Sequence, residues 1–237
     1  MNNELLILLG TAASVGIIHT ILGPDHYIPF IALAKSGKWT FRKTIFITVA
    51  CGIGHVLGSV LIGIVGLTFG IALNQIEYIE SLRGEIASWL LISFGIIYLI
   101  WGIKNIFRNN PHSHKHFHID GTQHIHNHSH TQNHVHVHDP EKHKKLTPWI
   151  MFIIFILGPC EALIPILLYP AAMQSASGVL LVTLTFGVFT VLTMTAIVLS
   201  SVFGLYKIKS GKFEKFSYLL AGIVITLCGI AIKVFEL

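Results

Sequence analysis

Charged residues are scarce in this chain of 237 residues. Asp, Glu, Lys and Arg make up 11% of it, whereas soluble domains carry about 25%. Hydrophobic residues make up 53%, and the mean hydropathy is +0.70. The shortage of charge excludes an ordinary soluble domain, and the apolar stretches reach the roughly 20 residues that cross the hydrocarbon core of a bilayer. We therefore predict an integral membrane protein.

Cysteine is scarce too, and phosphate-binding loops are missing. The three cysteines (Cys51, Cys160 and Cys228) all lie in apolar segments, and an odd number so placed argues against a disulfide framework. Neither a Walker motif nor another glycine-rich phosphate loop occurs, so we expect no ATP hydrolysis by this chain. The first apolar segment lacks a basic start and a clear cleavage site, which predicts a permanent span in place of a signal peptide.

Six apolar segments predict an all-α integral membrane protein with six transmembrane helices. They lie at residues 5–34, 44–73, 86–106, 148–172, 178–204 and 216–235. Lys and Arg concentrate in the first, third and fifth connections, and basic loops stay in the cytoplasm. We therefore expect a multi-pass protein of the cell (inner) membrane with both termini outside.

The two halves of the chain have related sequences. The letters ILGP at 21–24 return at 156–159, and the same offset of 135 takes Gly52 to Gly187. Each half holds three spans, an odd number, so the halves would lie in opposite orientation as a 3+3 inverted repeat, which is common in secondary transporters. Chance alignment of apolar text is the competing interpretation. The expected units are a first three-helix repeat, a His-rich cytoplasmic loop and a second three-helix repeat, at 1–106, 107–147 and 148–237.

Gly-Pro pairs interrupt the first and fourth predicted spans. Proline removes a backbone donor and clashes with the preceding helical turn. In lipid, the freed backbone groups are tolerated only where they are buried in protein or line a wet cavity. The residues predicted to break these helices are Gly23, Pro24, Pro29, Gly158, Pro159 and Pro165.

Ionisable side chains inside the predicted spans are few, and such groups mark a function by default. Imidazole suits nickel, cobalt, zinc and copper, and thiolate suits softer ions. For a single histidine, the competing interpretation is an interhelical hydrogen bond. The predicted metal path consists of His19, Asp25, His26, His55, Cys160 and Glu161.

A histidine-dense tract lies between the third and fourth spans and holds most of the 15 histidines of the chain. Such polar text cannot bury a core, so we expect it to be disordered without a ligand. Because neutral imidazole is a common metal ligand, we predict a cytoplasmic metal buffer, with a pH-sensitive linker or a charge tract as the competing interpretations. The predicted ligands are His112, His114, His116, His118, His124, His126, His128, His130, His134, His136, His138 and His143.

His19, then Asp25-His26 after a Gly-Pro pair, together with the His-rich loop, resembles the nickel/cobalt transporter superfamily, which includes the nickel-cobalt efflux and urease-accessory transporter-like membrane proteins. In the permeases of that group, four residues separate His from Asp-His, whereas here five do, TILGP. The resemblance implies that His19, Asp25 and His26 belong to a metal path. The expected function is transport of a divalent metal, nickel or cobalt before zinc or iron, with no resident cofactor and no enzymatic activity.

Two alternatives stay open. The stretch GPCEALIP at 158–165 resembles the proline-flanked cysteine of transmembrane thiol–disulfide carriers, which have a matching cysteine in each half. Here Asp25 occupies the position that matches Cys160, so the paired thiol is missing. The alternatives are thus a transmembrane thiol or electron carrier acting through Cys160, and an exporter of a small sulfur-containing solute. The expected partners are the bilayer and a transition-metal ion, with a homo-oligomer as an open option and no nucleic acid.

Overall fold

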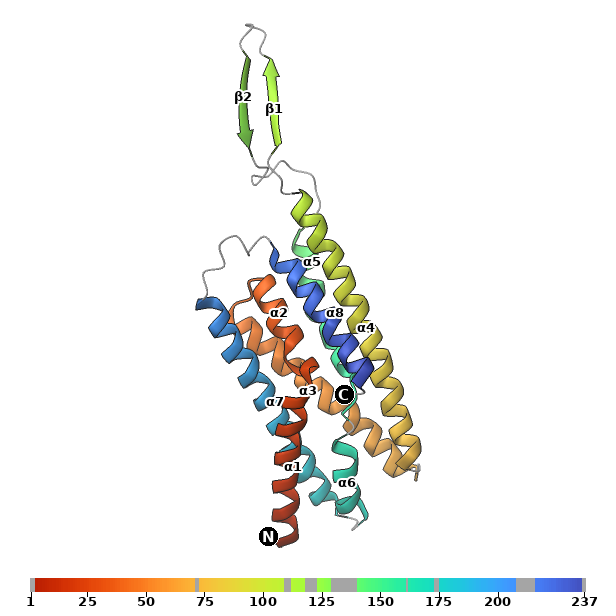
Figure 1. Ribbon diagram of the computed structural model, residues 1–237. Coiled ribbons are helices and arrows are strands. Elements are labelled where there is room, and N and C mark those ends of the chain that lie inside the picture. Colours follow the sequence, from red (N-terminus) through yellow and green to blue (C-terminus); the bar gives the residue numbers. More distant parts are fainter. Residues whose placement is uncertain are drawn as a thin grey trace.

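Helices form the body of the protein, and a two-stranded hairpin projects from one end of it (Figure 1). The computed structural model describes residues 3–70, 73–108, 112–117, 123–128, 140–160, 162–172, 175–207 and 216–235. Within these residues, five helices are long and apolar enough to cross a membrane: α1 (Asn3–Leu22), α3 (Phe41–Thr68), α4 (Leu73–Arg108), α7 (Ala176–Lys207) and α8 (Ser217–Phe235). The protein is therefore a multi-pass membrane protein.

The first predicted span is broken where the sequence indicated. Helix α1 (Asn3–Leu22) ends before Gly23, and a single 3-10 turn, η1 (Pro24–His26), precedes α2 (Ile28–Ser36). Pro29 was predicted to be part of the break, but it lies in the first turn of α2. There the missing amide hydrogen costs nothing, because the first four amides of a helix have no intrahelical partner. The break is thus made by Gly23 and Pro24.

The fourth predicted span is two short helices, α5 (Pro140–Leu157) and α6 (Leu163–Ala172). Gly158 and Pro159 lie between them, as predicted, whereas Pro165 belongs to the first turn of α6 and does not break a helix. Helix α5 begins eight residues before the predicted start at 148, because Pro140 fits the first position of a helix and Pro148 is accommodated inside it.

The remaining spans are the long helices α3 (Phe41–Thr68), α4 (Leu73–Arg108), α7 (Ala176–Lys207) and α8 (Ser217–Phe235). Helix α4 begins well before the predicted start at 86. Its first turns contain Glu77, Glu80, Arg83 and Glu85, which lie between the predicted spans 44–73 and 86–106. Glutamate and arginine are good helix formers, so their charge did not end the helix.

Part of the histidine tract, which we expected to be disordered, forms two strands. Strands β1 (His112–Phe117) and β2 (Gln123–His128) pair antiparallel, and the register sets His112 opposite His128 and His114 opposite His126. The alternation of histidine with other residues matches the two-residue period of a strand. His143 lies in α5. The predicted ligands His118, His130, His134, His136 and His138 lie outside the described residues, and the metal-buffering role stays a prediction.

Two hydrophobic clusters hold the helices together. The first joins α2, α3, α4, α5, α7 and α8, and the second joins α1, α3, α6 and α7. In α3, Cys51 belongs to the first cluster and Val56 to the second, so buried His55 lies at their border. The break between α1 and α2 and the break between α5 and α6 both lie near the middle of the helical body (Figure 1).

Helices α4 and α8 approach each other closely at four glycines, where backbone atoms of the facing helix lie next to the glycine. A Cβ atom on Gly102 would lie 2.6 Å from the Leu219 nitrogen, and one on Gly222 would lie 2.6 Å from the Leu99 Cα. Gly95 and Gly229 face the partner backbone in the same way. Small residues allow such close approach of transmembrane helices, which is where van der Waals attraction and backbone contacts are strongest.

Candidate functional site at the two helix breaks

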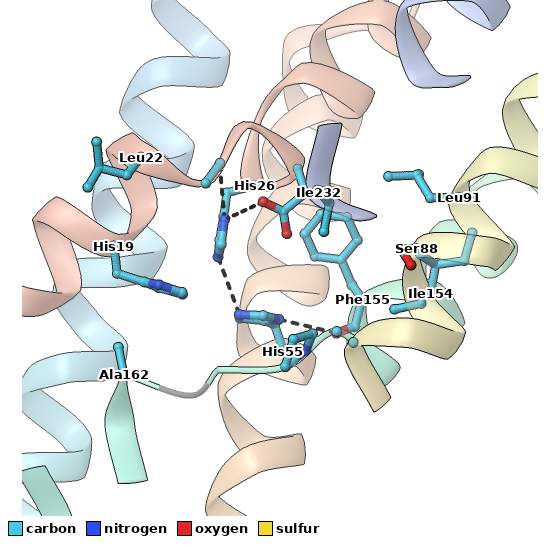
Figure 2. A pocket seen from close by; sticks show the side chains of 16 residues that line it. His19, Leu22, His26, His55, Ser88, Leu91, Ile154, Phe155, Ala162 and Ile232 are labelled. Atoms are coloured by element: carbon cyan, nitrogen blue, oxygen red, sulfur yellow. Dashed lines mark hydrogen bonds and ion pairs between the residues drawn. The ribbon is translucent and has the colours of Figure 1, made fainter. Parts of the chain in front are cut away.

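A cavity of about 320 Å³ lies between the break of the first span and the break of the fourth (Figure 2). The residues that line it include three histidines, Asp25 and the Gly-Pro pair of the second break: His19, Asp25, His26, His55, Gly158 and Pro159. Elements far apart in the sequence thus supply polar groups to one space inside an apolar body, as broken helices do in membrane proteins.

The three histidines of the predicted metal path come together. Figure 2 shows the His26 and His55 rings facing each other, and their Nε2 atoms are 3.3 Å apart. The His19 ring lies beside them, with its centroid 4.8 Å from that of His26 and 6.2 Å from that of His55. One nitrogen from each ring falls within 4.8 Å of the others.

The orientation of the His26 and His55 rings is set by oxygen acceptors. His26 Nδ1 is 3.1 Å from the Gly23 carbonyl oxygen and 3.1 Å from Asp25 Oδ1. His55 Nδ1 is 3.3 Å from the Phe155 carbonyl oxygen. A carbonyl oxygen can only accept, so Nδ1 carries the hydrogen in both rings when they are neutral. Both Nε2 atoms then present lone pairs to each other.

Glycines at the two breaks leave room for these rings. A Cβ atom on Gly23 would lie 2.5 Å from His26 Nδ1, and one on Gly158 would lie 3.2 Å from His55 Nδ1. The Gly-Pro pairs therefore have two effects. The proline ends the helix, and the glycine before it lets an imidazole lie directly against the freed backbone.

Cys160 follows the second Gly-Pro pair and is fully buried. Its backbone amide donates to Ser59 Oγ at 3.1 Å and to Glu80 Oε2 at 3.3 Å. Its Sγ lies 3.9 Å from His19 Nε2. Pro159, the residue before Cys160, and Ala162, two residues after it, line the cavity. The thiol thus lies beside an imidazole base and between residues that line the cavity.

Sequence reasoning missed the ion pair that holds the second break. Arg83 donates through Nη2 to the carbonyl oxygens of Ile156, at 2.7 Å, and Gly158, at 3.3 Å. Its Nη1 contacts Glu80, which is completely buried and also accepts from Ser59 Oγ at 2.9 Å. We name Glu80 and Arg83 of α4, together with Ser59 of α3, the α4 clamp. It satisfies backbone groups that the end of α5 would otherwise leave unpaired.

Two predicted site residues remain, Asp25 and Glu161. Asp25 lines the cavity and orients His26, as described above. Glu161 lies outside the described residues. Cys51 and Cys228, to which the sequence assigned no site role, are buried in the first hydrophobic cluster.

Comparison with protein families matches residues 28–231 to the family described as "Cytochrome C biogenesis protein transmembrane region". No curated protein and no solved structure matches this chain. The matched family is not a nickel/cobalt transporter family, so the resemblance read from His19 and Asp25-His26 was wrong, and so was the metal-transport function inferred from it. The match supports the alternative, a thiol or electron carrier.

Proposed function

Because this chain belongs to the family of cytochrome c biogenesis protein transmembrane regions, we propose that it is a transmembrane thiol carrier that acts through Cys160. The observation that carries the proposal is the position of Cys160. Its sulfur lies at a helix break, 3.9 Å from the His19 imidazole, and the residues around it line an internal cavity. A thiolate is the reactive form of cysteine, and a neighbouring imidazole favours it.

The proposed reaction is thiol–disulfide exchange in two steps. The Cys160 thiolate attacks a partner disulfide R–S–S–R′, and the thiol proton passes to the leaving sulfur. The Cys160–S–S–R bond forms, the R–S–S–R′ bond breaks, and R′–S⁻ leaves. A second thiolate, R″–S⁻, then attacks the R sulfur, so that R–S–S–R″ leaves and Cys160 recovers its thiolate and its proton. In the net exchange, the R sulfur changes its disulfide partner from R′ to R″: R′ is released as a thiol and R″ enters the new disulfide, with no further oxidant or reductant.

A carrier with a single cysteine at its site works through a mixed disulfide with its partner. Asp25 occupies the matching position in the first half, where it hydrogen-bonds His26. Cys51 and Cys228 pack in the first hydrophobic cluster, whereas Cys160 belongs to the second. The second sulfur of the exchange therefore comes from the partner.

Trapping of the mixed disulfide tests this function. A Cys51→Ala/Cys228→Ala variant, which keeps Cys160, should form adducts in cells that survive acid quenching and alkylation and disappear with reductant on gels. The matched Cys160→Ser variant, which keeps the other two cysteines, should form none. Equal adducts in both variants, or none in the first, would refute a role of Cys160.

We also infer that the two halves are an inverted repeat. The offset of 135 takes Gly52 to Gly187 and Val56 to Val191. A Cβ atom on Gly52 would lie 3.1 Å from the Val191 side chain, and one on Gly187 would lie 3.3 Å from that of Val56. Contacts that repeat when the halves are exchanged are expected of a two-fold relation.

The α4–α8 pair supports the same inference. An offset of 134 takes Gly95 to Gly229 and Ile92 to Thr226. A Cβ atom on Gly95 would lie 2.6 Å from the Thr226 nitrogen, and one on Gly229 would lie 3.0 Å from the Ile92 nitrogen. Each half thus contributes one broken span and two long helices.

Membrane sidedness follows from this arrangement and from the basic connections. Reporters of accessibility placed at Lys38, Asn127 and Lys212 should mark the cytoplasm, and reporters at Asn3 and Ser175 should mark the outside. Labelling with an impermeant reagent in intact cells measures this directly. Opposite sidedness of Lys38 and Asn127 would exclude two spans, α3 and α4, between them.

A further inference from the structure

We propose that His19, His26 and His55 bind one resident divalent transition-metal ion in the cavity between the helix breaks. The proposal goes beyond thiol exchange and does not depend on it, since Cys160 is not among the ligands. It concerns an ion held in place by the protein. One ring nitrogen of each histidine, from α1, η1 and α3, lies within 4.8 Å of the other two.

Ring orientation is the first argument. A histidine that ligates a metal usually donates its other ring N–H to a carboxylate or a backbone carbonyl, which fixes the tautomer. His26 does so to Asp25 Oδ1 and the Gly23 oxygen, and His55 to the Phe155 oxygen. Both rings are thereby held with Nε2 lone pairs aimed into the same space, as a metal requires and as two neutral rings alone would not favour.

The spacing is the second argument. In a tetrahedral site with metal–nitrogen bonds of about 2.0–2.1 Å, two ligand nitrogens lie about 3.4 Å apart. The observed separation between His26 Nε2 and His55 Nε2 is 3.3 Å. With Nδ1 protonated in both rings and no metal between them, two lone pairs would face each other at this distance. Three protein ligands with an open fourth position are typical of zinc sites that also bind water or a small ligand.

Charge and space favour a cation at this point. Asp25, through its contact with His26, supplies one negative charge beside the ligands, and a buried dication needs such compensation. The histidines line a cavity of about 320 Å³, which leaves room for the fourth ligand. Nitrogen ligands of this kind suit zinc, cobalt, nickel and copper better than calcium or magnesium, which prefer oxygen.

Cobalt(II) is the probe for this site, because four-coordinate cobalt absorbs visible light far more strongly than six-coordinate cobalt. Purified full-length protein in detergent should show an intense visible band that saturates with one equivalent. His26→Gln and His55→Gln should each lose it. A full-length variant with the histidines of 112–138 replaced by serine should keep the band, as should Cys160→Ser, which shows that the signal comes from neither the loop nor the thiol.

Thermal melting keeps the test decisive if a variant folds poorly. Zinc should raise the melting temperature of the protein, because a ligand that binds only the folded state stabilises it, and it should not raise that of His55→Gln. Absence of the band in the unsubstituted protein, or its survival in both glutamine variants, would overturn the proposal. Trapping at Cys160 is read separately, so failure of the metal site and failure of thiol exchange are distinguishable.

Discussion

Replacing Arg83 with methionine should destabilise the protein by about 3–5 kcal/mol, which is the usual cost of removing one partner of a buried ion pair. The change leaves the carboxylate of Glu80, which is completely buried, without its cation. It also removes the donors to the carbonyl oxygens of Ile156 and Gly158 at the end of α5. Because lipid offers these groups no replacement partner, the second helix break should loosen.

The measurement is the melting temperature of the detergent-purified protein, which should fall by roughly 6–20 °C. Lys233→Met is the matched control, since Lys233 also pairs with a glutamate of α4, Glu85, but at an exposed position. An exposed pair contributes about 0–1 kcal/mol, so the control should melt close to the unsubstituted protein. Equal melting of the two variants would show that the α4 clamp is not a structural element.

The clamp also predicts a local effect on the thiol. The amide of Cys160 donates to Ser59 and Glu80, and these two residues are themselves held by Arg83. Arg83→Met should therefore speed alkylation of Cys160 in the Cys51→Ala/Cys228→Ala background, while Lys233→Met leaves the rate unchanged. An unchanged rate in both would mean that the clamp does not position Cys160.

Replacing Gly222 with valine should cost about 1–3 kcal/mol or more, since it overpacks a tight contact. The new Cβ would lie 2.6 Å from the Leu99 Cα and against the Leu99 nitrogen, so backbone atoms must move. A flexible side chain could turn aside, but a helix backbone can only shift as a unit. Helices α4 and α8 should separate, and the melting temperature should fall by several degrees.

Gly204→Val is the control for this substitution. Gly204 lies in α7, and a Cβ atom there would have open space around it. The two variants share the loss of a glycine and the gain of a β-branched side chain, so their difference isolates the helix contact. If Gly204→Val melted as low as Gly222→Val, the cause would lie in helix propensity and not in packing.

Much of the fold could be predicted from local sequence features. Membrane insertion followed from the apolar segments, and the breaks at Gly23-Pro24 and Gly158-Pro159 followed from the backbone chemistry of proline. Helix ends were less predictable. The charged start of α4 suggested a loop, although a charge inside a membrane protein can be buried if a partner reaches it, as Arg83 reaches Glu80.

The function was predicted less well, because a short motif carries little information. His19 with Asp25-His26 indicated a metal transporter, whereas the match over residues 28–231 assigns a different family. That match extends over most of the chain and begins after Asp25-His26, so it does not depend on this motif. A few polar residues in apolar segments are compatible with several chemistries. Their identity alone therefore did not distinguish metal transport from thiol exchange.

By itself, the sequence determined that this protein crosses the membrane several times and that it carries imidazoles and a thiol beside two helix breaks. These properties depend on composition and on backbone chemistry, which are local. Only the tertiary structure decided that His26 and His55 meet at 3.3 Å, that Cys160 lies beside His19, and that Arg83 satisfies the end of α5. Each of these contacts joins segments that are far apart in the sequence, and their distances depend on how the helices pack.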